Sequence, residues 1–563
     1  MTDRPEHPKP QFQRENWTNL NGLWSFAVDS GESGSERGWQ NGSHPFGESI
    51  RVPFCPQSKL SGIENRDFMR SVWYRRTFPV DEKDLDGILR LHFGAVDYRA
   101  EVYINGERVG VHSGGYTSFW FDIQAYVKPG ENTLTVHAQD DERDPLIPSG
   151  KQCPSYASRG CHYTRTTGIW QTVWLERIPL THIESVRIIP SPETGTVTLT
   201  AVLAGNAELT AAAFYEGRSA GSVSCSCCGG TATLTIPLSE IHLWEIGCGR
   251  LYTLELSYGT DRVESYFGLR SLSFCGKAFL LNGKPVFQRL ILDQGFYPDG
   301  IYTAPTDSDL AEDIRRAQAM GFNGARLHQK IFEERFLYHA DRLGYLVWAE
   351  YPSWGLDLSD PRALHAILSE WLEEVRRDFN HPSIIGWCPL NETNNRQLES
   401  TLRMLYEATK LADPTRPCID TSGYVHVITD CYDVHDYEQD PDVFRSHYEN
   451  LSTTGAYHES HPSLQKYDGS APFFVSEYGG VFWSALGGWG YGKSPQSEAE
   501  YLARLRGLTD ALLDNPAVFG FCYTQLTDVE QEQNGLYTYE RAAKFPPHIL
   551  ASIFGREAAV ERT

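Results

Sequence analysis

The 563-residue sequence lacks the features that would place it in a membrane or on a nucleic acid. It contains no run of 18 apolar residues, so no membrane-spanning helix is predicted. The opening residues, MTDRPEHPKPQFQRENW, include no apolar signal-peptide core, so no signal peptide is predicted. Basic residues are not in excess, because 50 Lys and Arg stand against 73 Asp and Glu, a formal net charge of -23. This charge argues against nucleic acid and anionic membranes as partners.

Two further catalytic patterns are missing. No GxSxG follows a predicted strand, which argues against a serine hydrolase. The 12 cysteines are scattered, and the cluster SCSCCGG (Cys225, Cys227 and Cys228) has no second CxxC or histidine pair at zinc-ligand spacing. The segments VHDY and HESH are also only weak evidence for a metal site. We therefore predict no cofactor, no catalytic metal and reduced thiols, which are typical of a cytoplasmic protein.

The length predicts two to four domains, and 40% hydrophobic with 22% charged residues is typical of a globular protein. Residues 1–180 alternate short apolar runs with turn signals, as in SVWYRRTFPV, GILRLHFGAV and NTLTVHAQ, and predict a β-sandwich. Residues 181–270 keep a β pattern in pieces such as GTVTLTAVL and LYTLELSYG. These pieces predict a smaller sandwich of immunoglobulin type, with no chemistry visible in it.

Residues 271–563 alternate strands with helices. The segments DSDLAEDIRRAQAMG and FEERFLYHADRLG predict amphipathic helices that stop at glycine. Eight strand candidates follow one another: PVFQRLILDQG, FNGARLHQ, YLVWAEYP, SIIGWCPLNE, PCIDTS, CYDVHDY, PFFVSEYGG and VFGFCYTQLTD. This count and alternation predict a (β/α)8 barrel, in which polar residues at the C-terminal strand ends are the active-site candidates. Those residues are Glu350, Asn391, Glu392, His435, Glu477 and Asp528.

Two of these strand ends carry a carboxylate pair. Glu392 ends the fourth strand and Glu477 ends the seventh, so the two face each other across the barrel mouth. A lone Asn-Glu after a strand is usually a helix cap or a surface loop. Two opposed carboxylates instead provide what glycoside hydrolysis needs, a neutral acid for the leaving oxygen and an anion for the anomeric carbon.

The motifs WCPLNE, SEYGG and RTTGIWQTV resemble glycoside hydrolase family 2, the family of β-galactosidases, β-glucuronidases and β-mannosidases. The order of jelly-roll sandwich, immunoglobulin-like domain and TIM barrel resembles that family over nearly the whole chain. The resemblance implies that Glu392 is the acid/base and Glu477 the nucleophile of a retaining mechanism. It also implies that Asn391 holds the sugar 2-hydroxyl.

Further residues are candidates for binding the substrate. Tyr437, in YDVHDY, matches a tyrosine beside the family's nucleophile, and His435 lies two residues earlier on the same strand face. For both residues, the alternative to a role in substrate binding is simple packing at the end of a strand. Trp354 and Tyr523 are candidate aromatic walls for the sugar, with core packing as the alternative. Glu350 is a candidate for ordering the acid/base or pairing with a basic neighbour.

The sugar is less well defined. Glu532-Gln533-Asn534 stands where β-glucuronidases of the family carry Asn-x-Lys, so the usual lysine for the substrate carboxylate is missing. Other basic residues could replace it, because a uronic acid needs a cation. These candidates are Arg326, His328, Lys330, Arg335 and Arg165. For Arg335, the alternative to binding a uronate is a surface ion pair with Glu333 or Glu334. Asp293 could accept hydrogen bonds from sugar hydroxyls.

The segment from LDQGFYPDG to DRLGYLVW resembles a gut-bacterial branch of the family that includes β-galacturonidases and β-galactosidases. We therefore predict an exo-acting retaining β-glycosidase for terminal β-D-galacturonides, with small-molecule or oligosaccharide glycosides as substrates. A β-galactosidase is the alternative, and a β-glucuronidase a further one. The resemblance also implies a homo-oligomer of undefined size. A carbohydrate-binding protein with an inactive barrel is the non-enzyme alternative, although both carboxylates are present.

Overall fold

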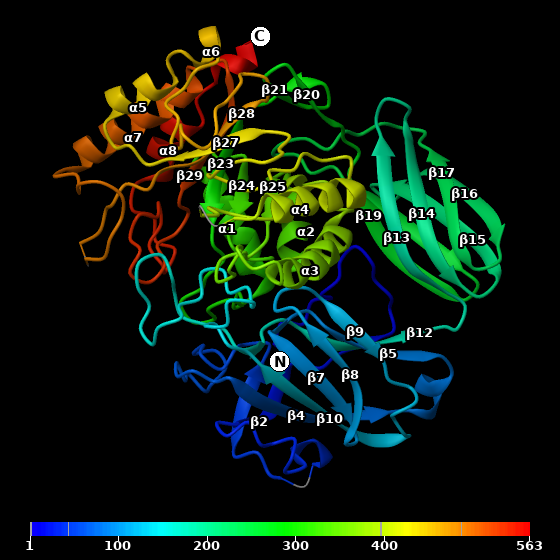
Figure 1. The fold of residues 1–563 in the computed structure, drawn as a ribbon. Helices are drawn as coiled ribbons and strands as arrows, with labels where there is room; N and C mark the ends of the chain where they lie inside the picture. The colour runs from blue at the N-terminus through cyan, green and yellow to red at the C-terminus, as the bar shows by residue number, and fades with distance from the viewer. Residues whose placement is uncertain (1–2, 43, 395–396, 486, 563) are drawn as a thin grey trace.

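The N-terminal domain of the computed structural model, which describes residues 3–42, 44–394, 397–485 and 487–562, is a two-layer antiparallel sandwich (Figure 1). One sheet has the order β1-β12-β5-β9 and the other β3-β2-β4-β10-β7-β8, with β6 and β11 paired separately. Alternate residues such as Leu134, Val136 and Ala138 of β10 enter the core between the sheets. The elements are β1 (Trp17–Asn19), β2 (Gly22–Val28), β3 (Glu48–Val52), β4 (Ser71–Val80), β5 (Ile88–Phe93), β6 (Val96–Asp97), β7 (Arg99–Ile104), β8 (Glu107–Ser113), β9 (Phe119–Asp122), β10 (Gly130–Gln139), β11 (Gly168–Ile169) and β12 (Val173–Ile178), with short 3-10 helices at Trp39–Asn41 and Glu82–Leu85.

The second domain is a smaller sandwich, with a three-stranded sheet β13-β14-β17 and a four-stranded sheet β16-β15-β18-β19. In the segment LYTLELSYG, the apolar residues Tyr252, Leu254 and Leu256 are buried and the residues between them are exposed. This division of strands between two sheets fits the predicted immunoglobulin type. The strands are β13 (His182–Ser191), β14 (Thr196–Ala204), β15 (Ala207–Tyr215), β16 (Arg218–Cys227), β17 (Gly230–Pro237), β18 (Tyr252–Tyr258) and β19 (Asp261–Phe267).

The third domain is built on a parallel sheet with the order β26-β25-β24-β23-β29-β28-β27. Its strands are β23 (Gln288–Asp293), β24 (Gly324–Leu327), β25 (Leu346–Glu350), β26 (Ile384–Cys388), β27 (Tyr432–Asp436), β28 (Phe473–Gly479) and β29 (Val518–Thr524). The small antiparallel sheet β20 (Leu272–Cys275), β21 (Ala278–Leu281) and β22 (Lys284–Pro285) precedes it. Phe279 and Leu281 of β21 pack against interior residues of the barrel such as Phe519.

The predicted strand PCIDTS is irregular in the structure. It runs parallel to β26 through the single pairings Trp387 with Cys418 and Asn391 with Ser422. The carboxylate of Asp420 accepts hydrogen bonds from the backbone N–H groups of Val427 and Ile428, at 2.7 and 3.0 Å. Such side-chain bonds compete with a regular ladder. The segment nevertheless fills the fifth position of the predicted barrel, between β26 and β27.

Helices surround the barrel strands in Figure 1, and both helices predicted from sequence are present. Thr306 caps α1 in a reciprocal arrangement with Asp309, and α2 ends at Gly344 with a left-handed φ of 63°. The helices are α1 (Asp307–Ala319), α2 (Glu334–Leu343), α3 (Ala363–Asp378), α4 (Glu399–Ala412), α5 (Pro441–Tyr448), α6 (Leu451–Thr454), α7 (Glu498–Leu513) and α8 (Pro547–Phe554), followed by a 3-10 helix at Ala559–Arg562. Across the residues that the structure describes, no helix is both long and apolar enough to cross a membrane. The predicted combination of sandwich, immunoglobulin-like domain and TIM barrel is confirmed.

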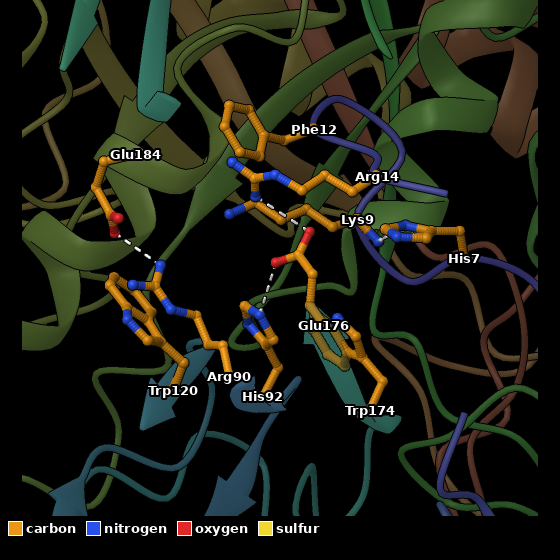
Figure 2. Close-up of a pocket in the computed structure, with 10 residues that line it drawn as sticks. All are labelled: His7, Lys9, Phe12, Arg14, Arg90, His92, Trp120, Trp174, Glu176 and Glu184. Carbon is orange, nitrogen blue, oxygen red and sulfur yellow. Dashed lines mark hydrogen bonds and ion pairs between the residues drawn. The ribbon is translucent and has the colours of Figure 1, made fainter. Parts of the chain in front are cut away.

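The first residues of the chain connect the domains instead of extending the sandwich. Arg14 donates to Glu176 on β12 at 3.2 Å and to Asp261 on β19 at 2.8 Å, so it joins the first two domains. Figure 2 shows Arg14 above Glu176, with His92 of β5 on the other side of the same carboxylate. Arg90, in the same view, reaches Glu184 on β13 at 2.8 Å. The cavity among these side chains measures about 30 Å³, which is room for about one water molecule and none for a sugar.

Replacing Arg14 by Met should weaken the contact between the first two domains. The variant leaves Glu176 and Asp261 buried without their guanidinium partner, which costs about 3 kcal/mol of unfolding free energy. Burial raises the pKa of Glu176, but its contacts with His92 and Arg14 outweigh burial and hold that pKa at about 2. This stability is present above the ordinary value of 4.5 and is lost as pH falls toward 2. Thermal unfolding should therefore show a lower Tm at pH 7 and a gap to wild type that narrows in acid.

The matched control is Arg262→Met, because Arg262 is exposed on the same strand as Asp261. It should leave the Tm nearly unchanged. An Arg14→Met protein as stable as this control would show that the buried ion pairs do not hold the domains together.

Candidate active site

Polar side chains gather at the C-terminal ends of the barrel strands, as the fold requires of a site in a parallel barrel. Neighbouring strands each contribute, and the loops after them complete the group. The contributing residues are Arg326 and His328 at the end of β24, Glu350 of β25, Asn391 and Glu392 after β26, His435 of β27 and Glu477 of β28. This set includes both predicted catalytic carboxylates and the predicted binding candidates Asn391, His435, Glu350, His328 and Arg326.

The two carboxylates lie close together with one histidine between them. Carboxylate oxygens of Glu392 and Glu477 and a ring nitrogen of His435 all lie within 4.8 Å of one another. Glu477 is buried, whereas the Glu392 side chain keeps 36% of its surface exposed. Glu392 has a left-handed φ of 44°, and its N–H donates to the carbonyl of Ser422 at 2.8 Å. Such a backbone costs about 1–3 kcal/mol and is typical of functional positions.

Glu477 is held as an anion. Arg326 Nη1 lies 2.7 Å from its Oε1, and the Tyr437 hydroxyl donates to its Oε2. Burial raises the pKa of Glu477, but the positive charges of His435 and Arg326 outweigh burial and the repulsion of Glu392, so the pKa is lowered. Tyr491 stacks on the Tyr437 ring with centroids 3.5 Å apart and fixes its orientation.

Glu392 shares a hydrogen bond with the histidine. His435 Nδ1 lies 2.7 Å from Glu392 Oε1, and its Nε2 lies 3.4 Å from Glu477 Oε1. Burial alone would raise the pKa of Glu392, but the bond to His435 outweighs it and lowers the pKa. Burial lowers the pKa of His435, and the two carboxylates more than reverse this, so it is raised. Both shifts favour a proton on the histidine, one hydrogen bond away from Glu392.

A second layer holds Arg326 in place. Its guanidinium pairs with Glu350 and donates to Asn391 Oδ1 at 2.5 Å. Glu350 also accepts from the N–H of Gln329 at 3.0 Å, and its Oε1 lies 2.9 Å from His328 Nδ1. The Asn391 amide nitrogen is buried and has no hydrogen-bond partner among the described residues. A buried donor without a partner is costly, so Asn391 presents an open position for a substrate oxygen.

Three carboxylate and imidazole ligands at this spacing would also suit a metal ion. The contacts of these side chains favour a catalytic carboxylate pair over a metal site. Glu477 Oε1 already accepts from Arg326, and Glu392 Oε1 already contacts His435. The protein itself thus supplies the positive charge that a metal would bring.

Three predicted cations do not reach this group, and the prediction that one of them binds a uronate is corrected. Lys330 is buried and donates to the carbonyls of Gly295 and Tyr302, at 2.6 and 2.8 Å. Arg335 pairs with Asp307 at 2.7 Å, and not with Glu333 or Glu334. Arg165 donates to loop carbonyls, including that of Ser155 at 2.5 Å, and lies 3.4 Å from Glu142. Each of these cations braces the chain around the site.

Of the two predicted aromatic walls, only Trp354 lies at the mouth. It is half-buried, and its indole N–H donates to the carbonyl of Asn391 at 3.1 Å. Tyr523 is fully buried and packs against Tyr478 and Phe554 in the core, which corrects its prediction. Asp293 ends β23 and accepts from the N–H of Gly295 at 2.9 Å. Burial and the neighbouring carboxylate of Asp313 raise its pKa to about 6.

A long segment of the sandwich, residues 140–167 between β10 and β11, completes the mouth. Figure 1 shows it in cyan between the sandwich and the barrel. The N–H groups of Ser149 and Gly150 donate to the carbonyl of Trp354, at 2.8 and 3.1 Å. The Tyr163 hydroxyl donates to Glu532, the residue in the place of the missing Asn-x-Lys.

Sequence analysis missed Lys151 on this segment. Its ammonium lies 3.8 Å from the centre of the Trp354 ring, and its side chain is buried. No motif surrounds it in the sequence, and the barrel begins more than 100 residues later. The sequence analysis named a different basic residue of the same segment, Arg165.

Comparison with known proteins agrees with this arrangement. The model of the sugar binding domain of glycosyl hydrolases family 2 matches residues 17–179, and the model of that family's TIM barrel domain matches residues 276–501. The two matches together cover more than half of the chain. The chain therefore belongs to glycoside hydrolase family 2.

The relatives described here are named either beta-glucuronidase or beta-galactosidase. A beta-glucuronidase of Mus musculus is 28% identical over 73% of this chain and 69% of its own length. A beta-galactosidase of Thermoanaerobacter pseudethanolicus is 28% identical over 58% of this chain and 45% of its own length. A Formosa agariphila relative is matched over only 53% of its length, so the chain spans about half to two thirds of these curated relatives. The crystal structure of Ruminococcus gnavus beta-glucuronidase superposes with a TM-score of 0.81 at 19% identity, over 99% of both chains, and so shares the fold.

Replacing Gly150 by Ala should displace the segment that carries Lys151. Gly150 has a φ of +54°, and an added Cβ would lie 2.4 Å from the carbonyl oxygen of Gln329. Relieving that clash costs about 1–3 kcal/mol and should speed hydrogen exchange of the 147–165 amides by about tenfold or more. Gly160 shares the φ of +54° with nothing within 4 Å of an added Cβ, so Gly160→Ala controls for backbone strain alone. Equal exchange in both variants would show that docking against Gln329 does not hold this segment.

Proposed function

We propose that this protein is an exo-acting retaining β-glycosidase that removes terminal β-D-hexuronides. The observation that carries the proposal is the Glu392, His435 and Glu477 group, whose oxygens and nitrogen lie within 4.8 Å of one another. Carboxyl groups about 5–5.5 Å apart permit direct attack on the sugar, whereas inverting enzymes leave a wider gap for water. The spacing supports retention.

The proposed reaction runs in two steps. An oxygen of Glu477 attacks the anomeric carbon, and the bond from that carbon to the leaving oxygen breaks as Glu392 gives this oxygen a proton. His435 Nδ1, 2.7 Å from Glu392 Oε1, is placed to supply that proton. Water then attacks the same carbon, Glu392 takes the proton from the water, and the Glu477 carboxylate is released.

The surrounding groups support these roles. Tyr437 and Arg326 stabilise the negative charge of Glu477, which keeps it ready to attack. The open amide of Asn391 is placed to donate to the sugar 2-hydroxyl, a bond that strengthens in the transition state. The segment 140–167 crosses the barrel mouth, and this supports an exo mode in which only a terminal sugar enters.

Two hexuronides remain candidates. The names of several relatives favour β-D-glucuronides, and these have the stronger support. The predicted β-D-galacturonide stays the second candidate, because Glu532-Gln533-Asn534 replaces the lysine motif expected of a glucuronidase. A β-galactosidase relative makes β-D-galactosides the alternative outside the uronides.

Replacing Glu477 by Gln should abolish hydrolysis while leaving the fold intact. The amide cannot form the glycosyl ester, so kcat should fall by about 10⁴-fold or more. Glu312→Gln, on the exposed end of an ion pair in α1, is the matched control and should keep wild-type rates. Initial rates on a chromogenic β-glycoside measure both. Full activity in Glu477→Gln would contradict the assignment of the nucleophile.

Initial rates on p-nitrophenyl β-D-glucuronide, galacturonide, galactoside and glucoside should identify the sugar. We expect at least one uronide to exceed both neutral sugars in kcat/KM by about tenfold or more, the value of one charged hydrogen bond. Proton NMR of the first product should show the β-anomer if configuration is retained. A clear preference for galactoside would contradict the uronide proposal and keep the glycosidase proposal.

A further inference from the structure

Lys151 is a buried residue that forms no ion pair with any other described residue. Lys151 is 5% exposed over the whole residue. Within the described residues, no carboxylate oxygen lies within 4 Å of its ammonium and no acceptor lies at hydrogen-bonding distance. The Trp354 ring, 3.8 Å away, offers a cation–π contact, which is weaker than a hydrogen-bonded ion pair.

The ammonium lies inside the barrel mouth. Its positive charge acts on the ionisable groups of the mouth. It opposes the burial that raises the pKa of Glu532, and it adds to the burial that lowers the pKa of His328 and to the bond with His435 that lowers the pKa of Glu392. Docking of Ser149 and Gly150 against the carbonyl of Trp354 fixes the backbone beside it. The Lys151 carbonyl also accepts from the N–H of Tyr163 at 2.7 Å, so both sides of the residue are held.

The other cations of the mouth already have partners. Arg326 is shared among Glu477, Glu350 and Asn391, as described above. His435 is shared between Glu392 and Glu477. Lys330 and Arg165 are bound by backbone carbonyls. Of these five basic residues, Lys151 is the one without a hydrogen-bond or ion-pair partner among the described residues.

Glu532 does not take up this charge. One of its oxygens accepts from the Tyr163 hydroxyl and the other from the Asn534 amide at 3.0 Å. Both carboxylate oxygens therefore already have a donor, and neither lies within 4 Å of the Lys151 ammonium. Glu532 therefore leaves the ammonium available for a further anion in the mouth.

We propose that Lys151 binds a carboxylate of the substrate, namely the one on the terminal hexuronide. The assignment rests on the proposed function for the identity of the sugar. The sandwich domain thus supplies the specificity-determining cation that the barrel of this chain lacks at Glu532-Gln533-Asn534. A lysine acts as a point charge and therefore accepts a carboxylate in several orientations, which fits either hexuronide.

The Lys151→Met variant tests the proposal, because Met keeps the length and apolar contacts of the stem. The kcat/KM for p-nitrophenyl glucuronide and galacturonide should fall by about 10- to 100-fold, the loss of a hydrogen bond to a charged group. The values for the galactoside and glucoside should change by less than about threefold, since neutral sugars offer no carboxylate. Lys151→Arg should restore part of the uronide rate. Lys59→Met, at an exposed ion pair, is the control.

An acidic aglycone offers the same carboxylate chemistry from the other end of the substrate. The β-galactoside of 4-hydroxybenzoate distinguishes it from the glycone. If Lys151→Met slows this compound and leaves p-nitrophenyl uronides unchanged, the cation serves the aglycone and the assignment to the sugar is overturned. Equal loss on all four p-nitrophenyl glycosides also overturns it, because charge recognition would then play no part.

A binding measurement separates this inference from the proposed activity. Calorimetric titration with free D-glucuronate and D-galacturonate should show about 10- to 100-fold weaker Kd values in Lys151→Met, with D-galactose and D-glucose as neutral controls. Lys151-dependent binding without any hydrolysis would support the inference and contradict the glycosidase proposal. Hydrolysis of uronides that does not depend on Lys151 would support the glycosidase proposal and contradict the inference. If wild-type protein binds neither uronate, the inference is overturned.

Discussion

The active-site mouth depends on one guanidinium. Glu350 and Glu477 are buried near each other, and their repulsion in a medium of low polarity would oppose folding. Arg326 contacts both carboxylates and the amide of Asn391, so it neutralises part of the charge and sets their positions together. His435 does the same on the other side for Glu392 and Glu477. The geometry of the carboxylate pair is thus a consequence of how these two cations are held.

The cations are in turn held by the barrel backbone. Arg326 lies in β24, between β23 and β25 in the parallel sheet, so its backbone is fixed by ladders on both sides. His435 fits because Gly423 beside it has no side chain, since a Cβ there would lie 2.3 Å from the imidazole. The irregular segment 417–422 and the glycine after it position two parts of the site. They keep Ser422 paired with Asn391 and leave space for the histidine ring.

The sequence predicted the class of fold and the carboxylate pair for the same reason. A parallel barrel places the ends of all its strands at one opening, so the position of Glu392 and Glu477 along the chain determines their location in space. Lys330 did not follow this rule. Gln329 takes a left-handed φ of 53°, which turns the chain so that the Lys330 ammonium reaches the carbonyls of Gly295 and Tyr302. The direction of a side chain after such a turn depends on tertiary contacts, which a strand pattern does not contain.

Lys151 was beyond prediction for a different reason. Its place at the mouth depends on how one domain docks on another, and no local pattern of residues 140–167 specifies that contact. The docking is visible only as hydrogen bonds to the carbonyl of Trp354 and as close packing of Gly150 on Gln329. Arg326 and His435 are paired with carboxylates of the barrel, and Lys330 is held by backbone carbonyls. The cation that recognises an anionic sugar, on the proposed assignment, comes from outside the barrel. On the proposed assignment, the sandwich is a structural part of the active site and could not be removed as an independent carbohydrate-binding module without changing the sugar that the barrel accepts.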